Sequence, residues 1–236
     1  DLLTLHPARQ REVRRWLQLA VSSLGIAGLF ALLLVLSRVP GADGFFPWID
    51  FFRTALVIHV DQSVLIWFLA MAGVVWSLSE RPRDRQQADR LSHLHNVAFA
   101  LAVAGTLGIA ASAFFGDGAA LMNNYVPVLQ RPFFFVSLAL FGAGIAVQLL
   151  LMLTTRHWQK LMRGGTPVEA AAVTIAIATA LSITGLLWSW WDIPADIQGQ
   201  GFFELLFWGP GHTLQFAYTQ LLVLSWLLLA LASGVV

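Results

Sequence analysis

The sequence predicts an all-α, polytopic transmembrane helix bundle with six membrane-spanning helices. Hydrophobic residues make up 58% of the 236 residues and charged residues only 11%. The mean hydropathy of +0.72 is too high for an ordinary soluble domain. Six separate apolar runs each approach the roughly 20 residues that cross a hydrocarbon core. Lysine and arginine gather in alternate connections, which is typical of a chain that crosses and recrosses a membrane.

The six apolar runs define the predicted spans, which cover about residues 16–37, 55–78, 97–115, 132–154, 168–188 and 207–232. Lipid leaves the backbone no partner outside a helix or a closed barrel, and runs this long without alternation are helices. The connections that follow the first five spans begin, in order, SRVPGADG, SERPRDR, GDGAALM, TRHWQK and DIPADIQ. None has room for a second domain, so residues 1–236 form a single integral membrane domain.

The positive charges predict the orientation. They cluster before the first span, between the second and third, and between the fourth and fifth: Arg9, Arg11, Arg14, Arg15, Arg81, Arg83, Arg85, Arg90, Arg156, Lys160 and Arg163. By the positive-inside rule we expect a cytoplasmic N-terminus. The opposite side is acidic and aromatic, with Asp43, Asp50, Asp117, Asp192, Asp196 and Glu204 among its residues.

Composition also limits the chemistry. The chain has no cysteine, so it carries no disulfide, thiolate metal site or iron–sulfur cluster, and a bound metal or haem needs histidine, methionine or oxygen ligands. There is no nucleotide-binding loop. The basic runs are short and explained by topology, so we expect membrane lipid and no nucleic acid among the partners.

Two histidines lie inside predicted spans. His59 stands in TALVIHVDQSVLIWF of the second span, and His212 follows Gly-Pro-Gly in the sixth. Counting along the helices places both roughly 6–10 Å below the acidic side. Ionisable groups at such depth are costly and are candidate site residues. The plain alternative is a hydrogen bond across helices. The remaining histidines, in or beside basic segments, are expected to be solvated: His6, His93, His95 and His157.

Other polar and small residues in the spans leave alternatives open. Asp61, two positions beyond His59, should face away from that ring, and a hydrogen bond to a neighbouring helix is its expected role, with a proton path as the alternative. Small residues in the third and fourth spans permit a flat cofactor between helices, although close helix packing uses the same residues. They are Ala98, Ala102, Gly105, Gly108, Gly142 and Gly144.

Two helices carry a family resemblance. VIHVDQSVLIWFLAMAG and WGPGHTLQFAYTQLLVLSWLLLA resemble the second and sixth helices of subunit I of the haem-copper oxidase superfamily, including its nitric oxide reductase branch. The loop NNYVPVLQRPFFF is similar to that of divergent members. The resemblance follows the whole chain in helix order but covers only the first half of a subunit with about twelve spans.

The resemblance implies cofactors. His59 matches an axial ligand of a low-spin haem of b or a type, and His212 matches a ligand of copper or of non-haem iron, with a high-spin haem in the complete protein. The Gly-Pro-Gly bend would start the helix that points His212 at this metal. Many oxidases carry a tyrosine four positions after that histidine, where this chain has Phe216. Tyr218, which faces elsewhere, is the catalytic tyrosine candidate left on this helix.

Three functions remain open. The leading hypothesis is part of the catalytic subunit of a bacterial inner-membrane terminal oxidase, fed by cytochrome c or a cupredoxin-like donor and reducing O2, with nitric oxide as the alternative substrate. Its other ligands would lie on the remaining helices of the subunit or on a second subunit. The second is a six-helix b-type cytochrome in which His59 and His212 ligate one haem. The third is a cofactor-free accessory or assembly subunit.

Overall fold

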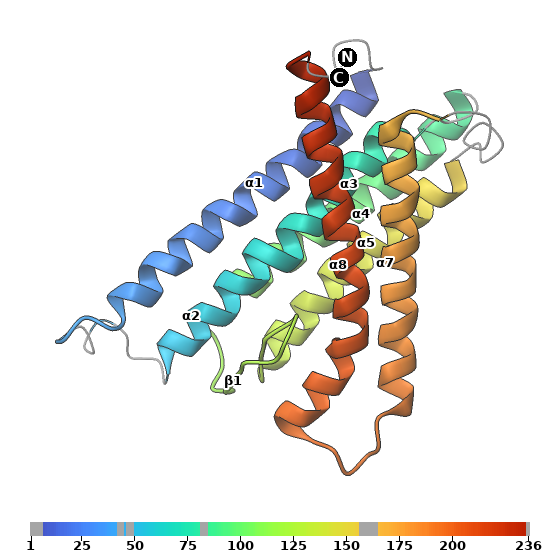
Figure 1. Cartoon of the computed structure of the whole chain (residues 1–236). Helices are drawn as coiled ribbons and strands as arrows, with labels where there is room; N and C mark the ends of the chain where they lie inside the picture. Colours follow the sequence, from blue (N-terminus) through green and yellow to red (C-terminus); the bar gives the residue numbers. More distant parts are fainter. Residues whose placement is uncertain (1–6, 42–44, 46–49, 81–84, 156–164, 235–236) are drawn as a thin grey trace.

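The computed structural model describes residues 7–41, 45, 50–80, 85–155 and 165–234. Six helices in these ranges are long and apolar enough to cross a membrane. They run up and down side by side, and α1 begins at the end of the bundle where α8 finishes (Figure 1). The chain is therefore a multi-pass helical membrane protein, as the sequence predicted.

Each observed helix overlaps one predicted span. The first crossing is α1 (Pro7–Leu36), and the second is continuous through α2 (Phe51–Val60), the π-helical turn η3 (Asp61–Ile66) and α3 (Trp67–Ser79). The others are α4 (Arg85–Ala111), α5 (Pro132–Thr155), α7 (Pro167–Asp192) and α8 (Gly199–Ala232). The helices are longer than several of the predicted spans: α1 starts nine residues before 16, α4 twelve before 97 and α8 eight before 207, whereas α4 stops four residues before 115.

The expectation that the Gly-Pro-Gly bend starts the sixth helix is wrong. Pro210 lies inside α8 and does not start it. The proline lacks an N–H and so removes one backbone hydrogen bond, a loss that transmembrane helices tolerate when neighbours satisfy the polar groups. The carbonyl that loses its usual donor is that of Leu206, four residues earlier. A separate contact ties α7 to α8 at this point, since the Ser182 hydroxyl donates to the Pro210 carbonyl at 2.9 Å.

The small residues of the third and fourth spans serve helix packing. A Cβ on Gly105 would lie 2.4 Å from the backbone nitrogen of Phe141, and one on Gly144 would lie 2.6 Å from the carbonyl oxygen of Ala98. These glycines let α4 and α5 approach backbone to backbone. A Cβ on Gly142, by contrast, would meet nothing within 4 Å. The packing interpretation of these residues is confirmed for this pair of helices.

A short hairpin connects α4 to α5 at one end of the bundle. We call residues 116–131 the α4–α5 hairpin; it holds β1 (Ala120–Leu121) paired antiparallel with β2 (Val128–Leu129). Arg131 at its base is buried and donates to the carbonyls of Ser112, at 2.6 Å, and Gly118, at 3.1 Å. The guanidinium thus satisfies backbone acceptors beyond the end of α4. Burial lowers the pKa of Arg131, while Asp117 opposes that shift.

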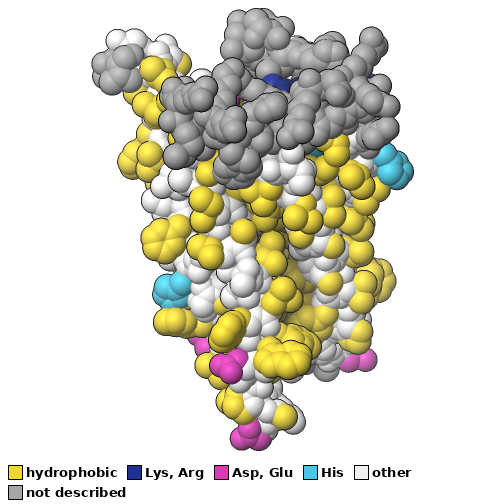
Figure 2. All heavy atoms as spheres, turned by 90° about the vertical axis from the view of Figure 1, so that its right-hand side faces the viewer, with side chains coloured by type: hydrophobic (Ala, Val, Ile, Leu, Met, Phe, Trp, Pro, Cys, Tyr) yellow, Lys and Arg dark blue, Asp and Glu magenta, His cyan; other side chains and the backbone are white. Residues whose placement is uncertain are grey.

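Acidic side chains gather at one end of the bundle. On the face drawn in Figure 2, hydrophobic side chains cover the middle of the molecule and acidic side chains lie at its lower end. That end holds the connection from α7 to α8 in Figure 1, where Asp192 and Asp196 are exposed. We call it the acidic end. The α4–α5 hairpin and the start of α2 lie at the same end (Figure 1).

Candidate functional site

His59 is held in one tautomer by the neighbouring helix. It lies half-buried in the last turn of α2, and its Nδ1 is 2.9 Å from the carbonyl oxygen of Ala27 on α1. A carbonyl only accepts hydrogen bonds, so Nδ1 carries the proton and Nε2 keeps its lone pair. Within the described ranges, no protein group is hydrogen-bonded to Nε2. The imidazole is therefore held in one orientation, with the lone pair of Nε2 available to bind a metal.

His212 has the same tautomer in a different setting. Its Nδ1 is 2.9 Å from the carbonyl oxygen of Trp208 one turn earlier on α8. Its Nε2 is 2.8 Å from the hydroxyl of Tyr125 in the α4–α5 hairpin. The rings of Trp208 and Tyr125 flank the imidazole, with centroids at 4.3 and 4.6 Å. His212 is nevertheless exposed on the surface of this chain.

This arrangement is typical of histidines that bind metals. A ligating imidazole nearly always donates its second N–H to a carbonyl or carboxylate, which fixes the ring and raises the basicity of the binding nitrogen. Both His59 and His212 have that second bond to a backbone carbonyl. Among the described residues, no three histidines or carboxylates come together as a complete metal site. Within the part of the chain that the structure describes, each ring offers one nitrogen and no complete set of metal ligands.

Sequence reasoning missed Tyr125. The α4–α5 hairpin carries this phenol onto α8, whereas the prediction considered only tyrosines on the sixth span itself. A Cβ on Gly211 would lie 2.3 Å from the Cβ and Cγ of Tyr125, so the ring lies directly on the helix backbone beside His212. The signal was present in the sequence, because a glycine next to a candidate ligand often marks a close approach by another segment.

Tyr218 lies away from His212. Its ring stacks on Phe68 of α3, with centroids 4.3 Å apart and planes 18° apart, within the packing between α3 and α8. Phe216, at the position where many oxidases have a tyrosine, is 71% exposed. Of the two tyrosines in the chain, Tyr125 is the one that reaches His212.

Asp61 does not make the hydrogen bond expected of it. The residue is fully buried at the start of η3, and neither carboxylate oxygen has a partner among the described residues. Gln62, one position further, makes the bond between helices instead, donating from Nε2 to the carbonyl of Thr106 on α4 at 2.9 Å. The π-helical turn begins two residues after His59, and such turns frequently lie at functional sites.

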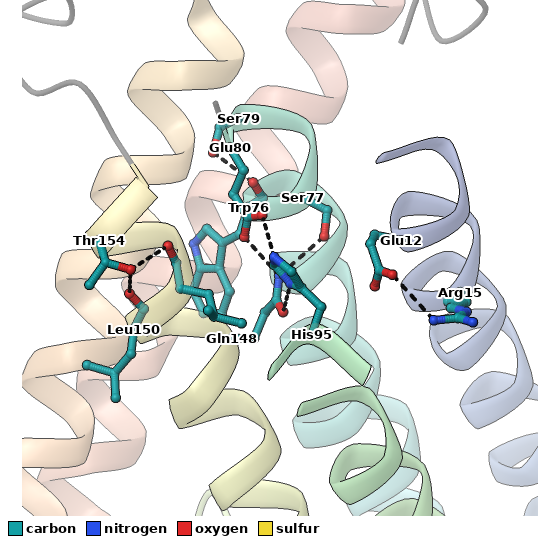
Figure 3. A network of polar contacts seen from close by, with 11 residues as sticks. Glu12, Arg15, Trp76, Ser77, Ser79, Glu80, His95, Gln148, Leu150 and Thr154 are labelled. Atoms are coloured by element: carbon teal, nitrogen blue, oxygen red, sulfur yellow. Dashed lines mark hydrogen bonds and ion pairs between the residues drawn. The ribbon is translucent and has the colours of Figure 1, made fainter. Parts of the chain in front are cut away.

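His95 is buried, which contradicts its expected solvation. Figure 3 shows it between Glu80 at the end of α3 and Gln148 on α5. Its Nε2 is 3.1 Å from Glu80 Oε2 and its Nδ1 is 3.2 Å from Gln148 Oε1. The Gln148 amide nitrogen in turn donates to Glu80 Oε1 at 3.2 Å and to the Ser77 hydroxyl at 3.3 Å. Because both ring nitrogens face acceptors, the geometry suits an imidazolium paired with a carboxylate.

For the residues that it describes, the structure gives no evidence that the remaining histidines belong to a metal or haem site. His93 is exposed, as predicted. His6 and His157 lie outside the described residues. Glu12 of α1 lies near the group formed by Glu80, His95 and Gln148 in Figure 3, and it bonds Arg15 at 3.3 Å.

Comparison with known proteins gives distant relatives. No family model matches the sequence, and no solved structure matches it either. "Uncharacterized protein RP382" of Rickettsia prowazekii (strain Madrid E) is 32% identical over 234 residues, covering 89% of this chain and 45% of that protein. An "Uncharacterized protein" of Aquifex aeolicus (strain VF5) is 33% identical over 214 residues, covering 91% and 52%. The chain thus spans about half the length of the curated relatives it matches.

Proposed function

We propose that this chain is part of the catalytic subunit of a membrane oxidoreductase of the haem-copper type, which reduces O2. His59 would be an axial ligand of a low-spin haem of b or a type. His212 would be a ligand of copper or of non-haem iron beside a high-spin haem. The alternative substrate is nitric oxide, which the nitric oxide reductases of the same superfamily reduce.

One observation carries this proposal. Each of the two histidines predicted from sequence as ligands donates its Nδ1 proton to a backbone carbonyl, Ala27 for His59 and Trp208 for His212, both at 2.9 Å. The His59 bond is at the same time the hydrogen bond across helices that the plain alternative expected, because Ala27 lies on α1. The shared arrangement makes Nε2 the nitrogen that would bind in both cases; it has no protein partner among the described residues in His59 and accepts from the Tyr125 hydroxyl in His212.

The exposed face of α8 supports a larger assembly. His212, Phe216 and Trp226 are exposed along this helix. An imidazole at membrane depth is costly when it faces lipid and is normally covered by protein. The curated relatives are about twice as long as this chain. We infer that further helices, of the same subunit or of a second one, cover this face and supply the remaining ligands.

Charge distribution supports a location and an orientation. The acidic end carries exposed Asp192 and Asp196, and the arginine-rich connections lie at the other end of the sequence-predicted spans. By the positive-inside rule the N-terminus is cytoplasmic and the acidic end faces outward. Both curated relatives come from bacteria, which favours the bacterial inner membrane. A cytochrome c or cupredoxin-like electron donor would then bind at the outer side.

The cofactors would supply electron transfer and substrate binding, and the protein would tune them through axial ligation and hydrogen bonding. The role of this chain is to orient two imidazoles. Ala27 and Trp208 fix the tautomers through their carbonyls, and the packing of α1 and of the α4–α5 hairpin keeps the rings from turning.

The test is cofactor content in the full-length protein, purified in detergent. We expect haem extraction and elemental analysis to give two haems and one additional metal ion per complete complex. His59→Gln should lose one haem and keep the additional metal, while His212→Gln should lose that metal and keep the low-spin haem. His93→Gln, which changes an exposed histidine, is the control. Colourless protein, or histidine variants with unchanged cofactor content, would refute the proposal.

A further inference from the structure

His212 has one contact that the proposed function does not explain. The Tyr125 hydroxyl lies 2.8 Å from Nε2, the nitrogen that a metal would use. Because Nδ1 donates its proton to the Trp208 carbonyl, Nε2 can only accept. The phenol is therefore the donor, and it occupies the lone pair of the candidate ligand.

The local backbone is specialised for this contact. Tyr125 has a φ of +69°, in the left-handed region that bulky residues rarely adopt. Gly211 leaves room for the tyrosine ring, since a Cβ there would lie 2.3 Å from Tyr125 atoms. Such unfavourable conformations persist only where surrounding contacts hold them, and they cluster at functional sites.

The rest of the hairpin is fastened to α8 near the same place. The backbone nitrogen of Asn124 donates to Glu204 Oε2 at 3.0 Å, and the Asn124 side-chain amide donates to Glu204 Oε1. Gln200 donates to the carbonyl of Met122 at 3.4 Å. Contacts on both sides of residue 123 therefore tie the hairpin to the first turns of α8, and this aims Tyr125 at His212.

We propose that Tyr125 is the positioning residue of His212. Its hydroxyl holds the imidazole in the Nδ1–H tautomer with Nε2 facing the hairpin, and it gives up this bond when a metal takes the Nε2 lone pair. The second half of this statement rests on the proposed function, whereas the first half stands on the hydrogen bonds alone. Tyr125 thereby competes with the metal that His212 would bind.

The tautomer is tested in full-length protein that has been labelled with ¹⁵N-histidine and stripped of metals by a chelator. His212→Gln identifies the His212 signals by their loss. In wild type we expect an Nδ1–H and an Nε2 shifted by an accepted hydrogen bond. Tyr125→Phe should move the Nε2 signal to the value of an unbonded lone pair, while Tyr218→Phe, which changes the tyrosine stacked on Phe68, should leave it in place. An Nε2 signal that ignores Tyr125→Phe overturns the proposal.

A second variant reaches the same contact without removing the hydroxyl. Gly211→Ala should displace the Tyr125 ring and shift the Nε2 signal as Tyr125→Phe does, because the new methyl group overlaps the ring. Gly209→Ala is the matched control, since a Cβ at that position meets nothing within 4 Å. If Gly211→Ala and Gly209→Ala shifted the His212 Nε2 signal equally, the hydrogen bond from Tyr125 would have no specific role.

Copper binding separates this inference from the proposed function. The stripped protein is titrated with Cu²⁺ alone, and bound copper is followed by its electron paramagnetic resonance. We expect Tyr125→Phe to bind about 2- to 10-fold more tightly, because a competing hydrogen bond is gone. Unchanged or weaker binding overturns the competition. If His212→Gln binds copper as wild type does, the proposed metal role of His212 fails, and the nitrogen signals alone decide the role of Tyr125.

Discussion

At the scale of single residues, hydrogen-bond partners distinguish the histidines better than sequence position does. His59 and His212 were predicted from their depth in the membrane, and the structure adds that each donates Nδ1–H to a carbonyl. His95 was predicted to be solvated because it follows an arginine-rich segment. The ring is buried because His95 lies within α4, which runs from Arg85 to Ala111, and because this helix packs the ring between Glu80 and Gln148.

The buried pair of His95 and Glu80 gives a prediction for stability. Both side chains are 10% exposed. Breaking such a pair by removing one partner leaves an uncompensated charge and typically costs about 3–5 kcal/mol. We expect Glu80→Gln to lower the thermal unfolding temperature in detergent by much more than Arg53→Gln, which breaks a surface pair with Asp50 that is 62% and 44% exposed.

A double-mutant cycle isolates the pair. Glu80→Gln combined with His95→Gln should be less destabilised than the sum of the single variants, because the double variant leaves no lone charge behind. Additive effects, or an effect of Glu80→Gln no larger than that of Arg53→Gln, would show that the two side chains are not coupled.

At the scale of helices, the number and order of the elements followed from hydropathy, and their ends did not. Hydropathy reports which residues avoid water, whereas a helix end depends on which group satisfies its last carbonyls. α4 stops at Ala111, and the carbonyl of Ser112 beyond it is satisfied by Arg131, a residue from another part of the sequence. α8 starts at Gly199, well before its apolar run, because polar residues of its first turns bind the α4–α5 hairpin.

The packing of α4 against α5 gives a prediction at this scale. Gly144→Ala places a methyl group 2.6 Å from the Ala98 carbonyl and should destabilise the protein by about 1–3 kcal/mol, the usual cost of overpacking. Gly142→Ala, two positions away on the same helix and with open space around it, should be neutral or slightly stabilising, since alanine favours helix. Thermal unfolding of the two variants in one detergent is the measurement. Equal unfolding temperatures would contradict the close approach of the two helices.

At the scale of the whole molecule, the fold class was predictable from the sequence, whereas the predicted assembly with further helices stays a prediction. Composition and charge were enough to predict a multi-pass helical membrane protein, because a bilayer permits few alternatives. The contact between Tyr125 and His212 was not predictable, since it joins residues 87 positions apart through a turn with an unusual backbone angle. The exposed face of α8 is the surface that the proposed further helices would cover, and the chain spans about half the length of the curated relatives it matches.

The optical spectrum of the full-length protein, reduced with dithionite and recorded with and without carbon monoxide, decides between the functions considered for this chain. We predict a Soret change on adding carbon monoxide, from a haem with an open coordination position, beside a low-spin band that does not respond. His59→Gln should abolish the unresponsive band. A haem signal wholly indifferent to carbon monoxide would indicate an electron-transfer cytochrome, and the absence of haem would contradict both functions.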